Sequence, residues 1–141
     1  MADDNKVLDC ISEAADMGRD SLHQVIGITE DDRFRQVLKT QLTEYEDMYR
    51  TVDRMLRTRE PKKANPMAKM SSRMQANWKS LTADNTTSKI AEMVIQGSTM
   101  GITKMTKVLH EYGGGNPEIQ SLAEKQIKTE QANIDEMKKF L

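Results

Sequence analysis

The chain has 141 residues, of which 37% are hydrophobic and 30% charged, a size and composition typical of one globular domain. Its formal net charge is −1, and its single cysteine, Cys10, excludes an intramolecular disulfide framework or a cysteine-based metal or redox cluster. The start MADDNKVLDC is acidic where a secretory signal is basic, and no stretch approaches the roughly 18 apolar residues of a membrane span. We therefore expect one domain over residues 1–141 that is soluble and cytoplasmic, without a membrane partner.

The N-terminal half contains two segments with apolar residues at helical spacing. The first predicts a helix over residues 5–26, after which Gly27 lets the chain turn. Thr29 is a good N-cap for a second helix over residues 30–59, which must end before Pro61. The inner stripe of this second helix is predicted to comprise Phe34, Leu38, Gln41, Tyr45, Met48, Val52 and Met55.

The next segment, EPKKANP, contains Pro61 and Pro66 and therefore cannot stay helical throughout. We predict a crossover here between the two halves of the chain. A short amphipathic helix is expected over residues 67–81. Its apolar stripe is formed by Met67, Met70, Met74 and Trp78. Methionines fill irregular gaps between helices well, so we expect this stripe to pack against the rest of the domain.

The C-terminal half predicts a helix over residues 86–112 and another over 117–141. Three glycines, at residues 113–115, supply a left-handed turn between them, and Asn116 and Pro117 suit the cap and first position of the last helix. Strand patterns are absent from the sequence. The expected fold is all-α: a four-helix bundle of two helical hairpins joined by a long crossover.

The two predicted hairpins are related by internal offsets in the sequence. An offset of 83 places Gly18 on Gly101 in the first helices of the two hairpins, and an offset of 85 places Gln41 on Gln126 in the second helices. Glycine inside a helix costs about 1 kcal/mol relative to alanine, so its presence at both points needs a structural reason. We expect the first and third long helices to cross closely at these glycines.

The run SSRMQANWKSLTADNTTSKIAEMVIQGSTMGITKMTKVL resembles a poorly characterised bacterial family of the ferritin-like superfamily. In that family a basic residue and a Trp precede a short polar loop, and the following helix carries small residues near its centre. The resemblance implies a ferritin-like four-helix bundle. Metal-binding members of the superfamily place a Glu on each of two helices and a Glu-x-x-His on each of the other two.

The chain departs from that ligand pattern. Neither of its two histidines, His23 and His110, follows a Glu by three positions. The residues that remain as weak candidates for a metal site are Glu13, Tyr45, Gln96, Glu130 and Asn133. Amides and a phenol are poor replacements for carboxylates around a hard cation, so we expect no cofactor, with iron or manganese as the alternative.

Several polar residues fall on the inner stripes of the second and fourth long helices: Gln41, Tyr45, Gln126, Glu130 and Asn133. Buried polar groups are costly unless they are paired. The favoured interpretation is a hydrogen-bonded network that fixes the register of the helices, and the alternative is a ligand site. If Glu130 is buried without a nearby cation, its pKa is expected to rise.

Charge is unevenly distributed along the chain. Residues 50–79 contain Arg50, Arg54, Arg57, Arg59, Lys62, Lys63, Lys69, Arg73 and Lys79 against Asp53 and Glu60, a balance of +7 that leaves −8 elsewhere. This segment contains no recognised nucleic-acid motif, so a solvated basic edge is favoured over a binding patch. If it is a patch, its centre is expected at Arg54, Arg57, Lys62 and Lys63.

The leading functional hypothesis is a non-enzymatic bundle with a degenerate metal site that acts by self-association, as a dimer, or by binding a protein partner. By analogy with ferritin-like proteins, such a bundle would serve in stress physiology or in a surface layer of spore-formers. The first alternative is a metal or redox protein with a reduced site around Glu13, Tyr45, Gln96 and Glu130. The second alternative is an adaptor that binds an anionic partner through residues 50–79.

Overall fold

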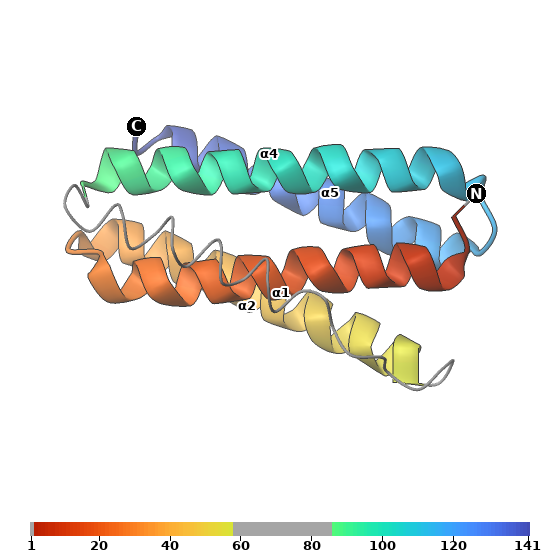
Figure 1. Cartoon of the computed structure of the whole chain (residues 1–141). Helices are drawn as coiled ribbons and strands as arrows, with labels where there is room; N and C mark the ends of the chain where they lie inside the picture. Colours follow the sequence, from red (N-terminus) through yellow and green to blue (C-terminus); the bar gives the residue numbers. More distant parts are fainter. Residues whose placement is uncertain (1, 58–85) are drawn as a thin grey trace.

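The computed structural model describes residues 2–57 and 86–141, which form four α-helices and, within those ranges, no strand (Figure 1). The helices are α1 (Asp4–Ile28), α2 (Asp32–Arg57), α4 (Thr87–Tyr112) and α5 (Pro117–Lys138). The all-α prediction is confirmed, and the predicted bounds differ from these by at most three residues wherever the ends can be compared. The predicted short helix over 67–81 lies outside the described residues.

Two antiparallel hairpins, α1 with α2 and α4 with α5, pack against each other mainly through α1 and α4 (Figure 1). These two helices run in opposite directions, and the Ala2 N–H donates a hydrogen bond of 3.2 Å to the Glu111 carbonyl near the end of α4. In Figure 1, α2 and α4 run in the same direction. The predicted crossover that joins them lies outside the described residues.

The turn between α1 and α2 differs from the prediction. Gly27 is still helical, and Thr29 ends α1, where its hydroxyl donates to the Val25 carbonyl at 2.5 Å. Asp31 is the residue that caps α2, because its Oδ1 accepts the Phe34 N–H at 2.8 Å. An aspartate directly before the first turn offers a charged acceptor to the helix N-terminus, which Thr29 cannot do from two residues earlier.

The turn between α4 and α5 agrees with the prediction. Gly113 and Gly114 adopt positive φ angles of 67° and 78°, the left-handed region that favours glycine. The Asn116 side chain then accepts hydrogen bonds from the N–H groups of Glu118 and Ile119 at the start of α5. This turn sets the angle at which α5 returns along α4.

The buried positions of the two hairpins follow the offsets found in the sequence. The buried residues of α2 are Phe34, Leu38, Gln41, Tyr45, Met48 and Val52, and those of α5 are Ile119, Ala123, Gln126, Glu130, Asn133 and Met137. Every member of the second set follows its counterpart by 85 residues. In α1 and α4, likewise, Val7, Leu8, Ile11, Ala15 and Leu22 precede the buried Ile90, Ala91, Val94, Ser98 and Met105 by 83 residues.

The two glycines that were expected at a crossing of the first and third long helices lie against side chains of the second helices. A Cβ atom at Gly18 would lie 2.6 Å from the Tyr45 ring of α2, and a Cβ at Gly101 would meet the Glu130 carboxyl group of α5 at 3.8 Å. Each glycine thus faces the second helix of its own hairpin. The two glycines leave room for a large or polar side chain at the bundle centre, and a close crossing of α1 and α4 at these residues stays a prediction.

Among the four described helices, none has the length and hydropathy that a membrane crossing requires.

The Gly18 contact predicts opposite effects for two glycine-to-alanine substitutions. Gly18→Ala forces the Tyr45 ring to move and is expected to lower the free energy of unfolding by about 1–3 kcal/mol. Gly97→Ala is also inside a helix, but no atom of another described element lies within 4 Å of the added Cβ, so this substitution is expected to raise it by about 0.5–1 kcal/mol. Urea unfolding followed by circular dichroism measures both, and equal stabilities of the two variants would contradict the proposed packing.

Candidate functional site

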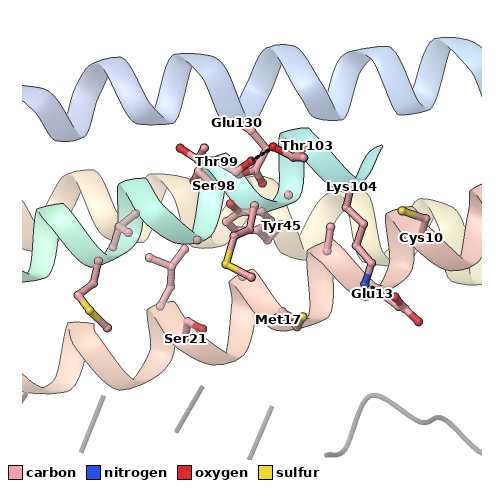
Figure 2. A pocket seen from close by; sticks show the side chains of 18 of the residues that line it. Cys10, Glu13, Met17, Ser21, Tyr45, Ser98, Thr99, Thr103, Lys104 and Glu130 are labelled. Carbon is pink, nitrogen blue, oxygen red and sulfur yellow. Dashed lines mark hydrogen bonds and ion pairs between the residues drawn. The ribbon is translucent and has the colours of Figure 1, made fainter. Parts of the chain in front are cut away.

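A groove with a volume of about 460 Å³ lies between α1 and α4 (Figure 2). Its α1 wall includes Cys10, Ala14, Met17, Gly18 and Leu22, and its α4 wall includes Met93, Val94, Gly97, Met100 and Gly101. Apolar atoms form most of the surface of both walls, although the lining also includes polar side chains on both helices, among them Ser21 of α1 and Ser98, Thr99 and Thr103 of α4. This combination of size and lining is typical of sites that bind small amphipathic molecules.

Small residues create the hollow between the two helices. Ala14 and Gly18 are one turn apart on α1, and Gly97 and Gly101 are one turn apart on α4, so each pair lies on one face of its helix. Within residues 2–57 and 86–141, and apart from the backbone of α4 itself, no atom lies within 4 Å of a Cβ added at Gly97. The faces of α1 and α4 that meet at this level therefore leave space between them.

Tyr45 of α2 and Glu130 of α5 line the inner end of the groove, between its α1 and α4 walls (Figure 2). Their side chains come from equivalent positions of the two hairpins and are almost fully buried, with exposed fractions of 5% and 3%. Both reach the groove beside Gly18 and Gly101, where a larger residue would occupy the space. The bundle thus brings a phenol and a carboxyl group to the base of an apolar groove.

The carboxyl group of Glu130 is only partly satisfied by hydrogen bonds. The Gln126 amide Nε2 donates to Glu130 Oε1 at 2.9 Å, whereas Oε2 has no hydrogen-bond partner in the described part of the chain. Both polar atoms of Gln41 and Nδ2 of Asn133 are likewise unpaired within residues 2–57 and 86–141. The expected burial of the inward polar residues is confirmed, but they do not form the fully paired network that we favoured.

Burial raises the pKa of Glu130 to about 7 from a usual 4.5, because the charged form is poorly solvated there. The nearby Tyr45 and Ser98 hydroxyls and the Gln126 amide oppose this increase, and the negative charge of Glu44 adds to it. Burial and the Glu130 charge also raise the pKa of Tyr45 well above its ordinary value. The pKa of Glu130 is therefore raised, as expected for a carboxyl group that is buried without a nearby cation.

An ion pair lies at one side of the groove. Lys104 Nζ on α4 lies 3.4 Å from Glu13 Oε2 on α1, and both side chains are partly exposed (Figure 2). Lys107 lines the groove one turn further along α4.

Burial also raises the pKa of the Cys10 thiol, which lowers its thiolate fraction at neutral pH. The charges of the groove are thus concentrated at its edge, apart from Glu130.

The candidate metal ligands are not brought together. Tyr45, Glu130 and Asn133 are buried at the bundle centre, but Glu13 lies at the groove edge in its ion pair and Gln96 is exposed on α4. No group of three or more His, Cys, Asp or Glu side chains in the described residues is placed to hold a metal ion. The donor set at the centre, one carboxylate with a phenol and amides, does not fit a di-iron or di-manganese site.

The basic patch is only partly within the described residues. Arg54 and Arg57 lie in the last turn of α2, where Arg57 Nε pairs with Asp53 Oδ2 at 2.9 Å, while Lys62 and Lys63 fall outside the described ranges. The structure does not place either arginine in the α1–α4 groove.

The sequence did not reveal the groove itself or the roles of Ser98 and Glu44 around Glu130. Two sequence features could have indicated them. Gly97, Ser98 and Gly101 place three small residues on α4 at helical spacing, and Glu44 directly precedes an inward-facing residue.

Comparisons with protein-family models, with curated proteins and with solved structures found no match to this chain.

The raised pKa of Glu130 predicts a specific pH dependence of stability. The folded state holds the Glu130 proton to about pH 7 and the unfolded state loses it near pH 4.5, so this group destabilises the fold progressively as pH rises between those values. Glu130→Gln, which cannot ionise, is therefore expected to gain roughly 3 kcal/mol of unfolding free energy relative to the wild type between about pH 4.5 and pH 8.

Urea unfolding at a series of pH values measures this difference. Glu124→Gln, an exposed position on the same helix, is the matched control. If the difference in unfolding free energy between the wild type and Glu130→Gln stays constant over the pH range, the raised pKa of Glu130 is contradicted.

Proposed function

We propose that this protein is a non-enzymatic, ferritin-like helical bundle that binds a small amphipathic molecule in the groove between α1 and α4. The observation that carries the proposal is the groove itself, about 460 Å³ with mainly apolar walls and a buried carboxyl group at its base. Ligand sites commonly combine such walls with one or two polar groups that orient the ligand.

The composition of the walls supports binding over a purely structural role. Met17, Met93 and Met100 line the groove, and Met100 is 62% exposed, which is unusual for a large apolar side chain. Methionine adapts to ligands of irregular shape because it is unbranched and flexible. The paired small residues on the facing helices keep the space between these methionines open.

The ferritin-like part of the proposal is supported by the arrangement of the helices. Two antiparallel hairpins with matching buried positions, in which α2 and α4 run in the same direction, follow the plan of that superfamily (Figure 1). The centre differs from its metal-binding members because a phenol occupies the position equivalent to Glu130. We therefore propose that a groove for organic ligands replaces the metal chemistry of such bundles.

Filling the groove is expected to abolish binding. Gly97→Leu places an apolar side chain in the open space, so binding of a neutral apolar dye such as Nile red should weaken at least about tenfold, as measured by a fluorescence titration. Gly27→Leu is the matched control, since Gly27 is exposed in α1, has no atom within 4 Å of an added Cβ and does not line the groove. Equal dye affinity of the two variants would refute the proposed site.

Self-association is the second candidate, and the exposure of Met100 beside the groove favours it. A second copy of the chain that packed on this face would bury Met100 and cover the opening. Met100→Lys would then convert a dimer to a monomer in sedimentation equilibrium, because a buried unpaired charge is strongly unfavourable at an interface. A wild-type protein that sediments as a monomer at all concentrations would exclude this candidate.

A further inference from the structure

We propose that the groove selects a ligand with a primary ammonium group and an apolar tail, and that Glu130 is the counter-ion of the ammonium. This inference rests on the proposed function, because it names the chemical class of ligand that the same groove would bind.

The first argument is the unpartnered carboxyl oxygen. Glu130 lines the groove and has an exposed fraction of only 3%. Its Oε2 atom has no hydrogen-bond partner in the described residues. A buried carboxylate with an unfilled acceptor position is costly, and a charged N–H donor gives it both the missing hydrogen bond and the missing charge. An ammonium group supplies both from one small head group.

The second argument is the sign of the surrounding charges. The charged group that acts on Glu130 most directly is Glu44, whose negative charge raises the pKa of Glu130. No cationic side chain is among the groups that shift the pKa of Glu130, and of the two lysines in the groove lining, Lys104 is paired with Glu13 at the edge. A cationic head group therefore lowers the electrostatic cost at the base of the groove, whereas an anionic one would increase it.

The third argument is the shape of the site. The Tyr45 side chain lies beside Gly18 and lines the groove together with Glu130, so both polar side chains of the bundle centre are at its base. Met17, Met93 and Met100 lie along the walls, where an alkyl tail would replace water. The base thus suits a charged head and the walls suit an apolar tail.

Binding of such a ligand is coupled to the proton on Glu130. Titratable or polar groups surround Glu130 at the base of the groove: Glu44 and Tyr45 from α2, Ser98 from α4, and Gln126 and Asn133 from α5. The charged groups from α1 and α4, Glu13 and Lys104, pair with each other at the edge. Glu130 is largely protonated below about pH 7, so an ammonium ligand must displace that proton there. Affinity for the ammonium ligand should therefore rise with pH up to about 7 and level off above it.

The test compares two probes with the same tail, octylammonium and 1-octanol, by isothermal titration calorimetry of the full chain. At about pH 8 the wild type should bind octylammonium at least about tenfold more tightly than octanol, and this preference should shrink at about pH 5.5. Glu130→Gln should abolish the preference while still binding octanol. The control Glu124→Gln, exposed on the same helix, should retain the preference.

The outcomes separate the two proposals. If octanol binds and octylammonium binds no more tightly, or if Glu130→Gln keeps the preference, the ammonium inference is wrong and the groove function stands. If neither probe binds the wild type, both proposals fail. The pH series of the wild type needs no variant, so a Glu130→Gln protein that failed to fold would still leave the inference open to refutation by a pH-independent preference.

Discussion

The contact between Gly18 and the Tyr45 ring is the constraint on which the centre of the bundle depends. With no side chain at Gly18, the phenol can lie across α1 at the middle of the bundle, and Gly101 leaves similar space for Glu130. Both second helices therefore place their central side chains beside glycines of the first helices, at the base of the groove. The burial of the carboxyl group at this point raises the pKa of Glu130.

In the same arrangement, the features that the proposed binding uses lower the stability of the bundle. A hydrophobic residue at position 130 would avoid the cost of a desolvated carboxyl group, and a larger residue at position 97 would remove a helical glycine and fill open space. The first change would remove the carboxyl group from the base of the groove, and the second would fill the space between its walls. Retention of costly features at a functional site is a common compromise in natural proteins.

Much of the fold could be predicted because it is recorded in local patterns: helical spacing of apolar residues, the glycine turn at residues 113–115, and the Asn116 cap. The α1–α2 turn was predicted less well, since Thr29 and Asp31 are both plausible caps and only the geometry decides between them. The centre was partly predictable, because the inner stripes named Tyr45 and Glu130. The groove was not, since a gap between helices depends on how two separate faces meet.

The offset of 85 that relates Tyr45 to Glu130 has a consequence for how such a centre can arise. Two identical hairpins paired by a twofold axis would place the same side chain at both positions, and two carboxyl groups so close together could not both ionise. Joining the hairpins in one chain lets the two positions differ. Covalent linkage thus permits one acid and one phenol where a symmetric assembly would be limited to a matched pair.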